Sequence, residues 1–261
     1  MIGMPDTLCA LRFIPAIGKL EMELIDEFTD ERNKSWCIHC GGWIAALDCN
    51  EDHVPTKGLL LKPRPHNLPV TIICKACNSG FSLDEEYFVA FLSAVLSGST
   101  TPQAQRIPSA SRALQSEKLR AKIEKSKTTY LTLGGETRFV WNPEIERTRR
   151  VILKNARGHA YFEYGEPMLD KPTHIWAYPI TALTSNEHDA FEGTSSEPAL
   201  TGWPEVGSRM MTRVMTGQDM DGSWVVVQDG TYRYSVTQEN GITVRSVLWE
   251  YLATEVIWRA R

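Results

Sequence analysis

Four of the six cysteines form two pairs with the spacing C-x-x-C, Cys37 with Cys40 and Cys74 with Cys77. Each pair supplies two thiolates, and four thiolates suit the tetrahedral coordination that a structural Zn²⁺ ion prefers. Because we expect a cytosolic chain, in which thiols stay reduced, disulfide bonds are the weaker interpretation. The sequence therefore predicts a structural zinc site made by these four residues, and the two remaining cysteines are assigned no role.

The segment between and just after the two pairs carries side chains suited to phosphodiester chemistry. Asp52 and His53 are adjacent, and Asn67 and Asn78 follow. Hydrolysis needs a water molecule deprotonated near neutral pH, which an imidazole can achieve, and a divalent cation that stabilises negative charge on the phosphorane and the departing 3′-oxygen. Neighbouring residues of a strand point to opposite faces, so Asp52 and His53 address different partners only if the strand ends or twists there. Val54-Pro55 can end it.

The order C-x-x-C, D-H-x-x-P, N-L, C-x-x-C-N resembles the zinc-containing branch of the HNH endonucleases. The catalytic fold of that family is a β-hairpin followed by a helix, arranged around one divalent metal ion. The motifs cover about residues 36–97. The stretch CNSGFSLDEEYF, together with Arg157-Gly158 and the later YFEYG, is also similar to stand-alone bacterial HNH proteins of about this size.

The resemblance implies a role for each matching residue. Asp52 is expected to ligate the catalytic metal ion, which would be Mg²⁺, Mn²⁺ or another divalent ion, and His53 is expected to be the general base. Asn67 would orient the His53 ring, and Asn78 would be a second metal ligand. The structural Zn²⁺ ion is separate from this catalytic ion.

Two departures from the family pattern leave alternatives open. The spacing between the two asparagines is longer than in the family, so Thr71 or a carbonyl group can orient His53 instead of Asn67. Ser82 stands where well-known members often have His, so Ser82, Glu85 or Glu86 can complete the metal shell, directly or through water. Ser82 and Glu85 also fit a helix capping box, which explains them structurally. Another alternative is that His39 ligates zinc in place of a cysteine.

The charge distribution points to a local rather than a global nucleic-acid surface. The formal net charge of −4 argues against a protein that coats nucleic acid through bulk electrostatics. Residues 112–157 nevertheless hold twelve Lys and Arg against five Glu, a local excess of seven positive charges. This excess indicates either a phosphate-attracting face or solvated helices. Nearer the predicted site, the candidate nucleic-acid contacts are Lys57, Lys62, Arg64 and Lys75.

We expect an α+β fold in two parts, an N-terminal ββα-metal (HNH) module with a four-cysteine zinc site, followed by a β-rich α+β C-terminal domain. The predicted divisions are 1–97, with the module core at 36–97, then a linker and basic helix at 98–127, and the C-terminal domain at 128–261.

In the first part, periodicity predicts a strand over Leu8–Ile14 and a helical stretch over Leu20–Phe28. VTII, just before the second cysteine pair, predicts a short strand, and a helix is predicted from near Leu83 to near Gly98.

In the second part, a basic helix is predicted over about residues 110–126, and a hairpin joins residues 130–133 to 137–141. A helix with Pro143 in its first turn is predicted to run to about His159, with Ile145, Ile152 and Ala156 on one face. Apolar and polar residues alternate along most of the remaining chain, which predicts strands.

These patterns together predict a cytoplasmic, metal-dependent HNH endonuclease that hydrolyses phosphodiester bonds, with DNA rather than RNA as the expected substrate. No apolar run reaches the roughly 20 residues that span a bilayer, so we expect no membrane partner. Bacterial defence or a mobile element is the context that family analogy suggests. The alternatives are a non-catalytic zinc-stabilised module that binds nucleic acid or protein, and a nuclease effector that is silent until a partner activates it. A protein partner or a second copy could bind through the C-terminal domain.

Overall fold

The computed structural model describes Met22, Glu23, Ile25 and residues 34–193 and 203–259. The predicted strand over Leu8–Ile14 lies outside the described residues, and so does the predicted helical stretch over Leu20–Phe28, apart from these three residues. The fold is mixed α+β, as predicted.

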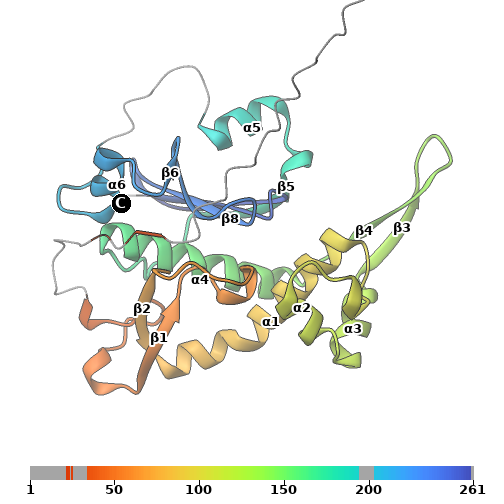
Figure 1. The fold of residues 1–261 in the computed structure, drawn as a ribbon, viewed down its shortest axis with the longest axis horizontal. Coiled ribbons are helices and arrows are strands. Elements are labelled where there is room, and N and C mark those ends of the chain that lie inside the picture. Colours follow the sequence, from red (N-terminus) through yellow and green to blue (C-terminus); the bar gives the residue numbers. More distant parts are fainter. Residues whose placement is uncertain (1–21, 24, 26–33, 194–202, 260–261) are drawn as a thin grey trace, which may run out of the picture.

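Figure 1 shows how the helices and strands of the described residues are arranged. The strands and α-helices are β1 (Cys49–His53), β2 (Val70–Cys74), α1 (Lys75–Ser97), α2 (Pro108–Ala113), α3 (Glu117–Glu124), β3 (Lys127–Leu131), β4 (Thr137–Trp141), α4 (Ile145–Tyr164), β5 (His174–Pro179), α5 (Ser185–Glu192), α6 (Arg209–Thr216), β6 (Met220–Asp221), β7 (Trp224–Gln228), β8 (Tyr232–Gln238), β9 (Gly241–Leu248) and β10 (Leu252–Arg259). Short 3₁₀ helices lie at Ile44–Ala46, Lys57–Leu59, Pro102–Ala104 and Ile180–Ala182.

A β-hairpin followed directly by a helix forms the N-terminal part of the described chain, and we call β1, β2 and α1 the ββα unit. β1 and β2 pair antiparallel, with Cys49 opposite Cys74 and Asp52 opposite Thr71. The strand ends at His53, as expected from the sequence that follows it. This order of elements is the one that the sequence resemblance implies.

The predicted start of the first long helix was wrong. α1 begins at Lys75, not near Leu83, and the Cys74 sulfur caps it by accepting the backbone N–H of Cys77. The S-x-x-E motif at Ser82 therefore lies inside the helix and caps nothing, because an earlier cap is already available. The end of the helix was predicted correctly, since Gly98 adopts the left-handed conformation that terminates it.

α4 lies between the ββα unit and a six-stranded antiparallel sheet (Figure 1). The strand order in the sheet is β5-β10-β9-β8-β7-β6. One face of the sheet packs on α4, and α5 packs on the other face through Phe191. On the α4 side, the buried His159 stacks on Tyr234, and Glu163 binds both Tyr234 and Arg213. The predicted helix at this position does exist, but Ile145 is mostly exposed and does not share the buried face of Ile152.

One hydrophobic cluster joins the ββα unit to the C-terminal sheet. It contains Leu59, Phe88 and Leu92 from the N-terminal side and Val151 and Val225 from the C-terminal side, among other buried residues. Residues on both sides of the predicted linker therefore share a core.

The basic region between the linker and α4 also differs from the prediction. The single helix predicted at about 110–126 is two helices, α2 and α3, because Ser116 caps a new helix with its side chain. The predicted hairpin is present as β3 and β4, although its first strand begins at Lys127. This hairpin projects away from the body (Figure 1).

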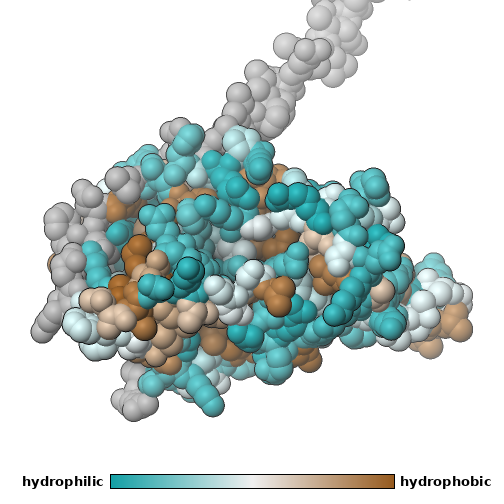
Figure 2. Space-filling view, turned by 90° about the horizontal axis from the view of Figure 1, so that it is seen from below, coloured by the Kyte–Doolittle hydropathy of each residue, from teal (hydrophilic) through white to brown (hydrophobic). Residues whose placement is uncertain are grey.

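The face that carries the ββα unit is mostly hydrophilic, with apolar residues confined to small patches (Figure 2). Within the described ranges, no helix combines the length and the apolar character needed to cross a lipid bilayer.

Gly158 of α4 permits the close approach that brings this helix to the end of β1. A β-carbon added there would lie 2.5 Å from Cγ2 of Val54. We expect Gly158→Ala to destabilise the protein by about 1–3 kcal/mol, since overpacking outweighs the gain in helix propensity. Gly80→Ala in α1 is the matched control, because nothing lies within 4 Å of its added β-carbon. Urea unfolding measures both, and a Gly158→Ala protein as stable as Gly80→Ala would contradict the packing.

Candidate functional site

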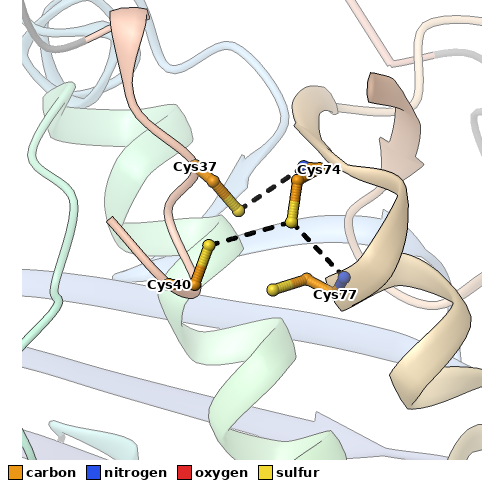
Figure 3. A group of neighbouring side chains, drawn as sticks. All are labelled: Cys37, Cys40, Cys74 and Cys77. Atoms are coloured by element: carbon orange, nitrogen blue, oxygen red, sulfur yellow. Dashed lines mark hydrogen bonds between the residues drawn. The ribbon is translucent and has the colours of Figure 1, made fainter. Parts of the chain in front are cut away.

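The four predicted zinc ligands come together in one cluster (Figure 3). Their sulfur atoms all lie within 4.8 Å of one another. The Cys40 and Cys74 sulfurs are 3.7 Å apart. Sulfur atoms bound tetrahedrally at zinc's usual bond length lie about 3.8 Å apart, so the spacing fits a metal ion. This four-cysteine cluster can hold a metal ion such as zinc, and its residues are the predicted ones.

Tight backbone geometry positions each pair. The first pair lies in a turn in which the Gly41 N–H donates to the Cys37 carbonyl at 2.8 Å, and Gly41 has a positive φ of 69°. The second pair spans the junction of β2 and α1. Burial alone would raise the pKa of the Cys37 thiol, but hydrogen bonds from the backbone at residues 74, 39 and 40 lower that pKa to about 7. Burial raises the pKa of the Cys40 and Cys77 thiols, so of these three thiols Cys37 is the one that most readily forms the thiolate that binds metal.

His39 lies outside the sulfur cluster and faces Asp52. Its side chain is only 2% exposed, and its Nε2 lies 4.0 Å from Oδ2 of Asp52. Neither ring nitrogen has a hydrogen-bond partner among the described residues. Burial, helped by the positive charges of Lys154 and Arg157, lowers the His39 pKa to about 3, so the ring is neutral. The four cysteines form the cluster without His39.

Asp52 points inward from β1, where it meets a lysine that the sequence analysis did not single out. The carboxylate is 7% exposed, and its Oδ1 lies 2.8 Å from Nζ of Lys154, which is 3% exposed on α4. The same ammonium contacts Oε1 of Glu85 on α1 at 2.5 Å. Burial raises the pKa of Asp52, although the charge and hydrogen bond of Lys154 oppose that rise. One buried ammonium therefore bridges two carboxylates from different elements.

A neutral network extends this cluster toward the surface. The Thr56 hydroxyl donates to Oε1 of Glu85 at 2.7 Å, and the Thr56 backbone N–H donates to Oδ1 of Asn155 at 3.0 Å. Glu85 and Thr56 also line an open cavity of about 380 Å³, together with Ser82, Glu86, Ser109 and Arg112. The three residues considered as further metal ligands, Ser82, Glu85 and Glu86, therefore border the same cavity.

His53 occupies the last position of β1 on the opposite face, where it is partly exposed. Burial, followed by the positive charge of Lys57, lowers its pKa below the ordinary value of 6.5. Arg64 also contributes, and its guanidinium donates to the Lys57 carbonyl at 3.2 Å. Two of the predicted nucleic-acid contacts thus surround His53. The other two, Lys62 and Lys75, are exposed.

The two predicted asparagines bind other groups. The Asn67 amide donates to the Met22 carbonyl at 2.7 Å, and the Asn78 amide donates to the Asn50 side chain at 2.9 Å. Thr71, the alternative for orienting His53, pairs with Asp52 across the hairpin and thus shares its face, not that of His53. In the described part of the chain, no hydrogen bond to the His53 ring is formed.

The fit of the two metals therefore differs. The sulfur cluster suits zinc. Asp52 and Asn78, the predicted ligands of the catalytic ion, do not suit a divalent ion, because Lys154 neutralises Asp52 and Asn78 is hydrogen-bonded to Asn50. In the sequence, Lys154 is one of twelve basic residues between positions 112 and 157. Its position inside the apolar run VILKNA was the available signal that it is buried.

Several members of the basic segment are paired rather than free. Arg147 and Arg150 both bind Asp84 of α1, each at 2.6 Å, and Lys122 binds Glu144 at 2.6 Å. These ion pairs hold α4 and α3 in place. Part of the excess of positive charge in residues 112–157 therefore has a structural role.

Comparison with known proteins does not assign the chain. No family model, no curated protein and no solved structure matches it.

Replacing Cys77 by Ser tests the zinc cluster. We expect loss of the bound zinc and a large fall in melting temperature, because a structural zinc ion contributes folding free energy directly. Cys49→Ser is the control, since the Cys49 sulfur contacts the carbonyls of Leu47 and Ile44 and is not one of the four clustered sulfurs. Zinc content and thermal unfolding report the result. Equal zinc content in the two variants would contradict the assignment.

Proposed function

We propose that this chain is a zinc-stapled endonuclease of the HNH type that hydrolyses phosphodiester bonds, with DNA as the substrate and His53 as the general base. The observation that carries the proposal is the position of His53. His53 is the last residue of the first strand of a hairpin, and this hairpin leads directly into a helix. The four-cysteine cluster lies where the hairpin meets the helix. The pKa of His53 is lowered and the residue lies on the outer face of the unit, where water and a phosphate group can reach it.

The role of His53 follows from its charge state. A lowered pKa keeps the imidazole neutral at physiological pH, so the ring can accept a proton from an attacking water molecule. Lys57 and Arg64 beside it are positioned to attract the phosphodiester. The proposal includes a divalent ion, Mg²⁺ or Mn²⁺, that supplies charge stabilisation when bound. The expected ligands of this ion, Asp52 and Asn78, have other partners in the structure.

One observation favours a second candidate. Lys154 forms ion pairs with both Asp52 and Glu85. The charge of the carboxylate on the inner face of the hairpin is therefore neutralised by a side chain of the protein itself. A non-catalytic zinc module that binds nucleic acid or a protein would tolerate this arrangement. So would an effector that stays silent until a partner moves α4, in a setting such as bacterial defence.

Cleavage of supercoiled plasmid by the zinc-loaded protein with Mg²⁺ or Mn²⁺ tests the proposal. We expect His53→Ala to lower the rate at least about 100-fold while leaving the fold and the zinc intact, because a general base contributes about that much or more. His174→Ala is the control, since His174 is an exposed residue of β5. DNA binding without cleavage by the wild type would favour the non-catalytic module.

The pH dependence of cleavage provides a further test. Since the neutral ring is the active form and its pKa is lowered, we expect the rate to stay constant as pH falls toward 6.5 and to decline only below it. Lys57→Met should move the midpoint of this decline to higher pH, because the positive charge of Lys57 contributes to the lowered pKa. Profiles of cleavage rate against pH for the wild type and for Lys57→Met measure the two midpoints. A midpoint above 6.5 in the wild type would exclude His53 as the base.

A further inference from the structure

The hairpin of β3 and β4, residues 127–141, presents apolar side chains to solvent, and we call it the arm. It projects from the body of the molecule (Figure 1). Leu131 is 72% exposed, Leu133 in the turn is fully exposed, and Tyr130, Phe139 and Val140 are each close to half exposed. A two-stranded hairpin alone is marginally stable in water, and a cluster of exposed apolar residues marks an interaction site. The arm therefore has the features of a contact surface.

An open, largely apolar cavity of about 300 Å³ lies at the root of the arm. Asn142 and Pro143, which follow β4 directly, line part of it, and the rest of its wall comes from the first turns of α4 and from β5. Ile145 of α4 and Tyr178 of β5 line this cavity and are both more than half exposed. The same chain thus carries an apolar projection and an apolar hollow.

The tip of the arm lies away from the cavity of its own chain. Each strand of the arm has five residues, which at about 3.4 Å per residue span about 17 Å. The turn that holds Leu133 lies beyond this span, whereas the cavity lies at the root. Two copies related by a twofold axis can place their arms antiparallel, so that each tip meets the root of the other arm. The two contacts are then equivalent, as in any interface with this symmetry.

The charges of the tip and of the cavity are complementary. Glu136 is the one charged residue in the segment 128–137, and Arg149 is the one charged residue among those that line the cavity. Glu136 pairs with Arg138 on the same strand pair at 3.0 Å, and Arg149 pairs with Glu146 on the same helix at 3.7 Å. Exposed pairs of this kind contribute little free energy, so both residues can change partners.

We propose that this chain forms a twofold-symmetric dimer by exchange of arms, in which Leu133 of each copy enters the cavity between α4 and β5 of the other. Glu136 then lies beside Arg149 of the second copy. The occupant is a second copy because one chain supplies both the apolar tip and the apolar cavity, with opposite charges beside them. This inference does not depend on the endonuclease reaction, since it concerns self-association alone.

The experiment is analytical ultracentrifugation of the full-length, zinc-loaded protein over a wide range of concentrations. We expect a monomer–dimer equilibrium in the wild type. Leu133→Asp places a charge in the apolar contact and should raise the Kd of the dimer at least about 100-fold. Since Leu133 is fully exposed within one chain, the substitution should leave the fold intact, which circular dichroism checks. Val206→Asp is the matched control, because Val206 is also highly exposed and precedes α6, at the other end of the molecule from the arm (Figure 1).

A second variant tests the cavity side of the contact. Ile145→Asp places a carboxylate in the first turn of α4, where a helix tolerates it, and should weaken the dimer as Leu133→Asp does. A mixture of Leu133→Asp and Ile145→Asp keeps one intact contact between tip and cavity in each mixed dimer. It should therefore associate more strongly than either variant alone.

Three results would overturn the proposal. They are a wild type that stays monomeric at every concentration, a Leu133→Asp protein that dimerises as Val206→Asp does, and a mixture that associates no more strongly than its components. A Leu133→Asp protein with unchanged mass but weaker DNA binding is a case of the second result, and it would assign the arm to nucleic acid instead. None of the masses depends on DNA cleavage, so failure here is distinct from failure of the proposed function.

Discussion

A cluster of four cysteine sulfurs, which lie within 4.8 Å of one another and can hold a metal ion such as zinc, sets the geometry of the N-terminal part of this protein. Cys74 serves both the cluster and the start of α1, so the cluster lies where β2 ends and the helix begins. The hairpin register, with Cys49 opposite Cys74, then determines that Asp52 points inward and that His53 points outward. The turn between the first two cysteines also carries His39 to Asp52. The position of the cysteine cluster is thus linked to the orientation of residues that are not part of it.

α4 provides the second constraint, because it contacts the ββα unit on one side and the sheet on the other. Gly158 lets it approach Val54, the residue after His53, and Lys154 enters the space behind β1. On the sheet side, Glu163 and His159 bind groups of β8. α4 therefore contacts both Asp52 and the sheet. Several ion pairs and a shared hydrophobic core link the two halves of the chain: Lys154 pairs with Asp52 and Glu85, and Arg147 and Arg150 pair with Asp84.

The sequence predicted best where local chemistry decides the structure. The spacing of the cysteines specified the sulfur cluster, and the end of α1 followed from Gly98. It predicted poorly where distant residues compete. The S-x-x-E motif at Ser82 was overridden by a cap at Cys74, and Lys154 could not be placed from its neighbours because its partners lie 102 and 69 positions away in the chain. Asn67 was assigned by resemblance, but its amide is used by the carbonyl of Met22.

We propose that water activated by His53 attacks a DNA phosphodiester. Cleavage of a defined duplex in water enriched with ¹⁸O, with mass analysis of the product ends, tests this step. Each cleavage by the wild type should place one ¹⁸O atom in the new terminal phosphate, and labelled ends should form at least about 100-fold more slowly with His53→Ala. Cleavage without incorporation of ¹⁸O, or label that appears at the same rate without the His53 imidazole, would contradict it.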